Sequence, residues 1–249
     1  MLRPVFAANW KMNNGPTAAV EFMRSFISVY PKQNDRTVIF FPPALSVAPV
    51  RAAVRERADL LLGVQNIHWE AQGAFTGEIS ASMARDAGAT VVLVGHSERR
   101  HVFGETDEEC GKKVVAAEKA GLTPMLCVGE KLEERERGET ESVVLRQLRA
   151  GLSGLSAPHS GPLLIAYEPV WAIGTGKTAT PADAAAVHRV LRAELSAFAG
   201  EKAGRVPILY GGSVNQGNAS ALLAAENVDG LLVGGASLDP NTWLSITTA

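Results

Sequence analysis

The feature that most constrains the fold is a regular alternation of short apolar runs with segments of helical spacing. Eight apolar runs rich in β-branched residues predict strands, at 5–11, 37–41, 60–65, 90–95, 123–129, 163–168, 206–211 and 229–234. Most of the runs are continuously apolar rather than alternating, which is typical of parallel strands covered on both faces. The sequence therefore predicts an α/β protein whose parallel strands are joined by helical crossovers.

Helical spacing follows each of these runs. It is clear at 17–29, 44–58, 107–120, 139–152, 181–199 and 216–226, and weaker at 80–87 and 237–247. Thr106 with Glu109 predicts a capping box, Gly121 a helix end, and Thr180-Pro181 a helix start. The charged segment 131–137 (KLEERER) predicts a solvated surface with ion pairs four residues apart.

Eight such units with no linker between them favour one closed (β/α)₈ barrel over an open, doubly wound sheet. The length of 249 residues is typical of a barrel that forms one domain, so residues 1–249 are expected to make up a single domain. Eight parallel strands would then be surrounded by their helices.

Composition narrows the possible partners and the compartment. A net charge of -2 argues against general binding of nucleic acid, which requires a basic field. No apolar run approaches the roughly 20 residues of a membrane-spanning helix, and none resembles a signal peptide. Cys110 and Cys127 lie in no metal-binding or CxxC pattern and are interpreted as reduced thiols. We expect a cytoplasmic protein without nucleic-acid or membrane partners.

Polar residues at the ends of the predicted strands are the candidates for chemistry, because barrel active sites lie at the carboxyl ends of the strands. Asn9 and Lys11 end the first strand on one side of it, although Lys11 alone could also be an exposed surface lysine. His96 follows the fourth strand and is a candidate acid–base group, the alternative being a structural histidine. The other histidines form no metal-ligand pattern.

Glu168 ends the sixth strand, where a carboxylate could abstract a proton at neutral pH. The segment 169–177 then joins a rigid Pro-Val-Trp start to a Gly-Thr-Gly tip, as a hinged lid would. Its Gly-Lys-Thr end invites comparison with a phosphate-binding P-loop. That interpretation fails, because the P-loop spacing requires glycine where this sequence has Trp171.

Glycine pairs end the last two strands, as Gly211-Gly212-Ser213 and Gly234-Gly235. Glycines allow backbone N–H groups to approach a ligand closely, and many barrels hold a phosphate after strands seven and eight. A tight turn is the alternative for either pair alone, but two pairs at adjacent strand ends favour a phosphate site.

Taken together, these segments resemble the triosephosphate isomerase family. The matching motifs occur in family order at 9–12 (NWKM), 73–78 (GAFTGE), 95–100 (GHSERR), 166–178 (AYEPVWAIGTGKT), 210–213 (YGGS) and 233–238 (VGGASL). The resemblance spans nearly the whole chain and implies a closed TIM barrel acting as one catalytic domain. Departures such as Ala8 and Asp239 touch no position matched to the catalytic residues.

The resemblance implies a role for each site residue. Glu168 would be the base, and neutral His96 would polarise the carbonyl oxygen. Lys11, assisted by Asn9, would stabilise an enediolate and the substrate phosphate. Glu98 and Ser97 would support these residues, with Glu98 holding Lys11. The substrate phosphate would be bound by the backbone N–H groups of Gly174, Ser213, Gly234 and Gly235.

The implied reaction interconverts D-glyceraldehyde 3-phosphate and dihydroxyacetone phosphate, in glycolysis and gluconeogenesis, with no cofactor or metal. The resemblance also implies a homodimer formed through the loop 65–80, with Thr76 near the partner's Lys11. As a monomer, this loop would expose Ile67, Trp69 and Phe75. Two alternatives remain open, a Schiff-base aldolase and an inactive barrel that only binds triose phosphate.

Overall fold

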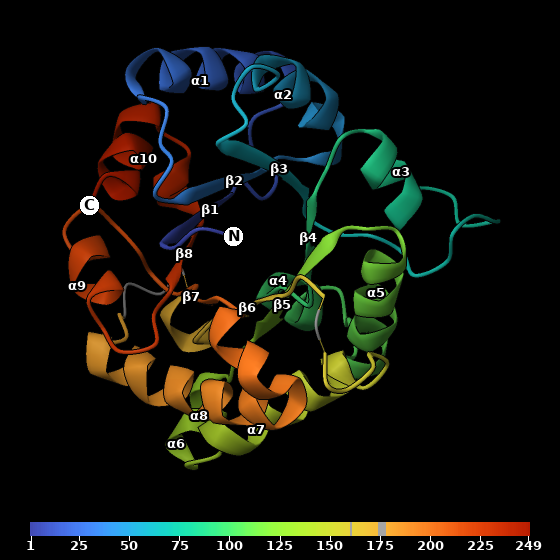
Figure 1. Ribbon diagram of the computed structural model, residues 1–249, viewed down its shortest axis with the longest axis vertical. Coiled ribbons are helices and arrows are strands. Elements are labelled where there is room, and N and C mark those ends of the chain that lie inside the picture. The colour runs from blue at the N-terminus through green and yellow to red at the C-terminus, as the bar shows by residue number, and fades with distance from the viewer. Residues whose placement is uncertain (160, 174–177) are drawn as a thin grey trace.

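The computed structural model describes residues 1–159, 161–173 and 178–249. Eight parallel strands pair in chain order, and β1 pairs with both β2 and β8, so that the sheet closes into a barrel (Figure 1). This confirms the predicted (β/α)₈ fold. The strands are β1 (Val5–Asn9), β2 (Thr37–Phe41), β3 (Leu60–Val64), β4 (Val91–Val94), β5 (Thr123–Val128), β6 (Leu164–Tyr167), β7 (Ile208–Tyr210) and β8 (Gly230–Val233).

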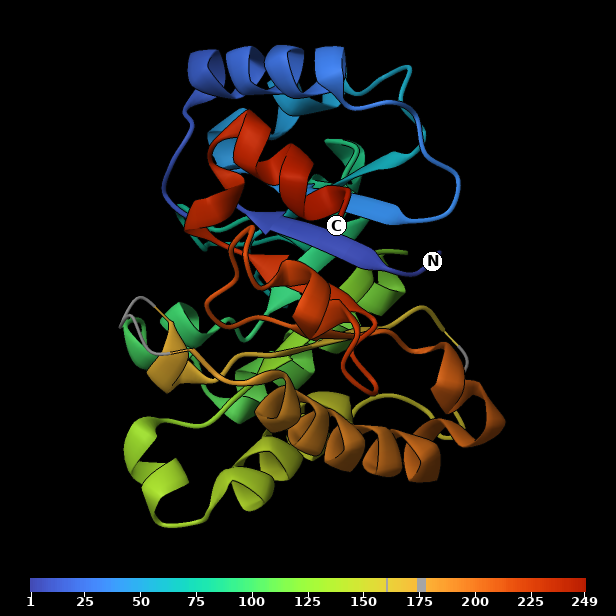
Figure 2. The same cartoon turned by 90° about the vertical axis from the view of Figure 1, so that its left-hand side faces the viewer.

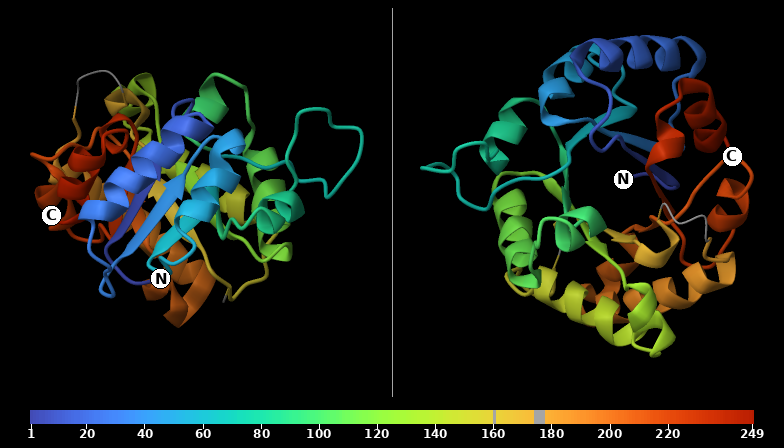
Figure 3. Two further views of the ribbon diagram at one scale, coloured as in Figure 1. Left: turned by 90° about the horizontal axis from the view of Figure 1, so that it is seen from above. Right: turned by 180° about the vertical axis from the view of Figure 1, so that it is seen from behind.

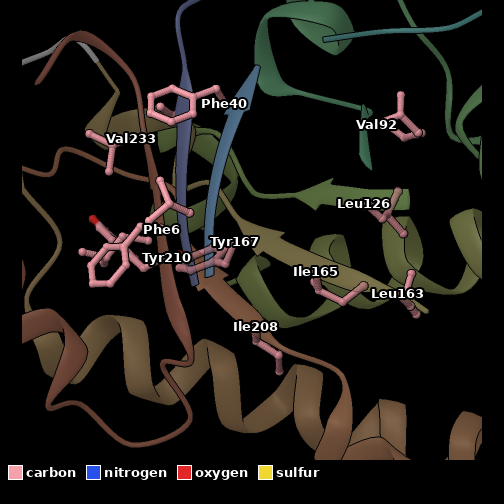
Figure 4. Close-up of a cluster of buried hydrophobic side chains, with 14 of the residues drawn as sticks. Phe6, Phe40, Val92, Leu126, Leu163, Ile165, Tyr167, Ile208, Tyr210 and Val233 are labelled. Atoms are coloured by element: carbon pink, nitrogen blue, oxygen red, sulfur yellow. The ribbon is translucent and has the colours of Figure 1, made fainter. Parts of the chain in front are cut away.

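Each strand divides its side chains between two apolar cores, which is why most of the runs are apolar without interruption. One set fills the barrel interior: Val5, Ala7, Ile39, Phe41, Val91, Leu93, Met125, Cys127, Leu164, Ala166, Leu209 and Leu232. The alternate set packs outward against the helices and includes Phe6, Phe40, Tyr167 and Tyr210 (Figure 4). The prediction of strands covered on both faces is confirmed.

The helices form a ring around the barrel (Figures 1 and 3). They are α1 (Pro16–Val29), α2 (Val47–Ala53), α3 (Ala81–Asp86), α4 (Ser97–His101), α5 (Asp107–Lys119), α6 (Leu132–Glu136), α7 (Thr140–Leu152), α8 (Pro181–Ala199), α9 (Ala219–Leu223) and α10 (Pro240–Thr247). Both predicted caps are present, at Thr106 and Thr180. Among the residues that the structure describes, no helix is both long and apolar enough to cross a membrane.

Two predicted helices are shorter than expected. The segment 44–58 is a 3₁₀ turn (Ala44–Ser46) followed by α2, and Arg57 then binds Asp59 and the carbonyl of Tyr30, which directs the chain into β3. The segment 216–226 keeps only α9. Asn215 and Asn218 bond to nearby backbone N–H groups, and such bonds compete with helix formation.

Two short helices, α4 and α6, were not predicted. Each has five residues, which is too short to give a clear helical period. The prediction of a solvated surface with ion pairs four residues apart at 131–137 is wrong in part, because Arg135 of α6 bonds to Asp183 of α8 at 2.7 Å. That contact depends on how the barrel brings the two helices together.

A buried carboxylate, Glu105, lies between α4 and α5 and forms ion pairs with both helices. The Glu105 carboxylate accepts bonds from Lys113 at 2.9 Å and Arg99 at 3.0 Å, and Lys113 also binds Asn66 at 2.8 Å. Burial alone would raise the pKa of Glu105, but Lys113 and Arg99 hold that pKa below its usual value. The stability contributed by Glu105 is therefore present above the usual glutamate pKa and is lost as the pH falls.

Glu105→Gln should lower the free energy of unfolding at pH 7 by about 3 kcal/mol, because it leaves the Lys113 charge buried without its partner. Urea unfolding followed by circular dichroism measures this. The deficit should shrink as the pH falls below the ordinary glutamate pKa, because the unfolded wild-type chain takes up a proton there before the folded Glu105 carboxylate does. Glu108→Gln, at an exposed pair with Lys112, is the control and should change little. Equal effects at both positions would contradict the interpretation.

Candidate active site

The predicted site residues converge at the carboxyl ends of the strands. A cavity of about 280 Å³ opens there. In Figure 2, β1 runs from the N-terminus toward this end of the barrel. The cavity is lined by Asn9, Lys11, His96, Glu168, Ile173, Gly211, Gly212, Ser213, Val214, Leu232, Gly234, Gly235 and Ala236. Residues from strands far apart in the sequence thus share one site.

Lys11 reaches the cavity by a route that the sequence did not indicate. The strand ends at Asn9, and Lys11 has a φ of 52°, a left-handed conformation that is rare for residues other than glycine. The Asn9 side chain accepts a bond from the Lys11 backbone N–H at 3.0 Å, and Gln65 donates to the Lys11 carbonyl at 2.8 Å. Gln65 is therefore a supporting residue that sequence reasoning missed.

The ammonium group of Lys11 is fixed by Glu98. Its Nζ lies 2.6 Å from Glu98 Oε1, across 87 positions of sequence. Both side chains are partly exposed, so the pair is accessible to a ligand in the cavity. The predicted contact between these two residues is present in the structure.

His96 is buried and caps the N-terminus of α4. Its Nδ1 accepts a bond from the Glu98 backbone N–H at 3.2 Å, so in this arrangement Nδ1 carries no proton. Nε2 faces Glu168 Oε1 at 3.0 Å. Burial alone would lower the pKa of His96, but the Glu168 carboxylate raises it above its ordinary value.

Glu168 follows β6 and is 2% exposed. One carboxylate oxygen accepts a bond from the Ser97 backbone N–H at 3.0 Å, and the other lies 3.4 Å from the Ser97 hydroxyl. Burial alone would raise the pKa of Glu168, but His96 and the Ser97 N–H lower it below its ordinary value. The group is therefore a carboxylate at neutral pH, held beside an imidazole.

Two glycines make room for Glu168. A Cβ on Gly129 would collide with the Glu168 carbonyl oxygen, and one on Gly211 would lie 2.9 Å from the Glu168 Cγ. A larger residue at position 129 would have to displace backbone rather than a flexible side chain. The glycine at position 211 thus serves close packing as well as any approach of a ligand.

Three of the four predicted phosphate-binding positions line the cavity. Ser213, Gly234 and Gly235 line the cavity, and a 3₁₀ turn (Gly235–Ser237) begins there. Gly174 lies outside the described residues, as does the whole Gly-Thr-Gly tip of the predicted lid. Within the described residues, no group of three or more His, Cys, Asp or Glu side chains could hold a metal ion.

A carboxylate, an imidazole and an ammonium group around one small cavity, beside two glycine-rich strand ends, define a barrel enzyme that performs acid–base chemistry on a small substrate. Comparison with known proteins specifies the family. A family model described as triosephosphate isomerase matches residues 4–249. The chain belongs to the triosephosphate isomerase family, whose members are isomerases.

Relatives with this name align over almost their full length. The chain is 46% identical over 247 residues to the triosephosphate isomerase of Solibacter usitatus (strain Ellin6076), covering 99% of both chains. It is 48% identical over 247 residues to those of Roseiflexus sp. (strain RS-1) and Carboxydothermus hydrogenoformans, covering 99% of this chain and 97% and 98% of theirs. The resemblance inferred from the motifs is confirmed.

Proposed function

We propose that this chain interconverts D-glyceraldehyde 3-phosphate and dihydroxyacetone phosphate, and that residues 1–249 act as one catalytic domain in the cytoplasm. The observation that carries the proposal is the convergence of Glu168, His96 and Lys11 on one cavity. A coupled spectrophotometric assay of the purified protein with glyceraldehyde 3-phosphate tests it. Absence of turnover by folded protein would overturn the proposal.

Glu168 is the proposed base. It removes the proton from the carbon next to the carbonyl, and the C–H electrons form the double bond of an enediolate. The protonated carboxyl group then returns the proton to the neighbouring carbon, which completes the isomerisation without net loss of a proton. To do this, a Glu168 oxygen must leave its bonds to Ser97 and His96 and face the substrate.

His96 is the proposed partner of the substrate oxygens. Its Nε2 proton can pass to the carbonyl oxygen as charge develops there, and the ring recovers a proton from the second oxygen. When Glu168 turns to the substrate, its influence on the pKa of His96 decreases. Burial and the Glu98 N–H bond to Nδ1 then both favour the neutral ring, the form proposed for this step.

Lys11 is proposed to bind the substrate anion, with Asn9 assisting. A fixed positive charge in a partly enclosed cavity stabilises the enediolate oxygen as its charge develops. Backbone N–H groups at Ser213, Gly234 and Gly235 would hold the phosphate, together with Gly174. The carbonyl of the substrate acidifies the neighbouring C–H bond, so the proposal needs no cofactor or metal.

The two alternatives make different demands on the chain. A Schiff-base aldolase needs a lysine within a middle strand, but β4, β5 and β6 read VVLV, TPMLCV and LIAY. Borohydride trapping with substrate would detect such an enzyme. An inactive binding barrel would not need the full set of Glu168, His96 and Lys11. The coupled assay separates it from an enzyme.

A homodimer is proposed from the exposed surface. Large apolar side chains are exposed in the loops that follow four consecutive strands, β1 to β4: Met12, Leu45, Phe75, Val102 and Phe103. The loop 65–80 projects from the same part of the barrel (Figures 1 and 3). Exposed apolar clusters of this kind are typical of protein interfaces. We place the partner subunit's Thr76 near Lys11.

The expected exposure within this loop is corrected in one respect. Ile67 is fully buried, whereas Phe75 is 43% exposed and packs against His68 in a tilted arrangement, with ring centres 4.3 Å apart. The Trp69 ring also stacks on His68, with ring centres 4.1 Å apart. Ile67 is therefore part of the chain's own core, and the proposed contact involves the outer part of the loop.

Thr76→Arg should convert the dimer to a monomer at micromolar concentration, because it places a charge where the loop enters the partner. Light scattering should give about twice 26.3 kDa for the wild type and about 26.3 kDa for the variant. Ser220→Arg is the control, because α9 lies on the opposite side of the barrel in Figure 1. A wild-type monomer with full activity would contradict the proposal.

A further inference from the structure

Trp171, three residues after Glu168, is held on two sides by side chains from α6 and the turn before it. Its indole N–H donates to Glu130 Oε1 at 2.9 Å. The guanidinium carbon of Arg135 lies 4.5 Å from the centre of its ring. A planar guanidinium over an indole face is a favourable cation–π arrangement. Trp171 is therefore oriented by a hydrogen bond at its edge and a cation at its face.

Glu130 ties the chain on both sides of Glu168. This carboxylate is fully buried and also accepts a bond from the Tyr167 hydroxyl at 3.1 Å. Its backbone carbonyl accepts from the N–H of Val170 at 3.0 Å. Arg135 supplies a positive charge 3.7 Å from Glu130 Oε1. Glu130 thus contacts Tyr167, which precedes Glu168, and both Val170 and Trp171, which follow it.

Arg135 also reaches the start of α8. Its Nη2 donates to Asp183 Oδ1 at 2.7 Å. The other oxygen of Asp183 accepts from the backbone N–H and the hydroxyl of Thr180, at 2.9 and 2.7 Å, in the capping box of α8. One guanidinium therefore connects Trp171 to the cap of α8, and these two points flank residues 172–179 in the sequence.

We propose that Arg135 is a positioning residue for the reaction, which fixes the segment 170–172 behind Glu168 by joining Trp171, Glu130 and Asp183. Arg135 does not line the cavity, so it acts on the substrate only through these residues. The inference rests on the proposed function, because it assigns Arg135 a part in the motion of Glu168 from Ser97 to the substrate. Its charge and its planar shape both contribute.

Arg135→Gln removes the charge, whereas Arg135→Lys keeps a charge that can still reach Asp183 but loses the planar stack. For Arg135→Gln we expect kcat to fall about tenfold with KM within about twofold, because Arg135 lies outside the cavity that Ser213, Gly234 and Gly235 line. Arg135→Lys should recover part of the lost kcat. Arg137→Gln is the matched control, since Arg137 pairs with Glu139 at the surface, and it should leave kcat unchanged.

Fluorine NMR of protein labelled with fluorotryptophan provides a readout independent of activity. The resonance of Trp171, assigned by Trp171→Phe, should shift or broaden in Arg135→Gln, while those of Trp10, Trp69 and Trp243 stay in place. An unchanged kcat and an unchanged Trp171 resonance in folded Arg135→Gln would overturn the inference. So would an equal loss of kcat in Arg137→Gln. An inactive wild type would instead contradict the proposed function.

Discussion

Glu168→Gln should lower kcat by about 10²–10⁴-fold, the usual contribution of a positioned proton-transfer group. Glutamine has nearly the same shape, so it can keep a bond to the Ser97 N–H that now holds the carboxylate at 3.0 Å. It cannot accept a proton from carbon. The fold and the affinity for inorganic phosphate should therefore persist while turnover is lost.

Two measurements test this expectation together. Steady-state kinetics should show the loss in kcat, and calorimetry should show phosphate binding within a few-fold of wild type. Glu56→Gln, at an exposed position outside the cavity, is the control and should keep full activity. A Glu168→Gln enzyme within tenfold of the wild-type rate would reject Glu168 as the base.

Lys11→Met should lower kcat/KM by at least about 10²–10³-fold, the typical cost of losing one contact to a developing oxyanion. The loss of activity in Glu168→Gln should appear in kcat, whereas the loss in Lys11→Met should appear in both kcat and KM. The reason is that the ammonium group is proposed to bind the phosphate as well as the enediolate. Methionine keeps most of the apolar stem, so a packing defect is small. Glu98 loses its partner but remains partly exposed to water.

Kinetics over a range of substrate concentrations separates the two components. Lys112→Met, at an exposed lysine on α5, is the control and should leave both constants unchanged. An unchanged KM and kcat in Lys11→Met would return Lys11 to the alternative of a surface lysine. A change in KM alone would restrict its role to binding the phosphate.

Local sequence determined the fold class and the end of the barrel at which the site lies. Eight apolar runs, most of them continuous, predict parallel strands covered on both faces, and this follows from burial alone. Strand ends then locate Asn9, His96 and Glu168, since the carboxyl ends of parallel strands share one edge. The capping signals at Thr106 and Thr180 were also sufficient to locate the starts of α5 and α8, because a cap involves residues only three positions apart. Short helices such as α6 carry too few residues to give such a signal.

Only the tertiary structure decided how the site residues are held. The left-handed backbone of Lys11 is supported by Gln65, and Glu168 is bound by Ser97, across 54 and 71 positions of sequence. Arg135 likewise finds Asp183 only across 48 positions. None of these pairings has a local pattern, because each forms only where barrel closure brings separate loops together. The sequence specifies which chemical groups are available, and closure of the barrel sets their distances, their burial and the direction of their pKa shifts.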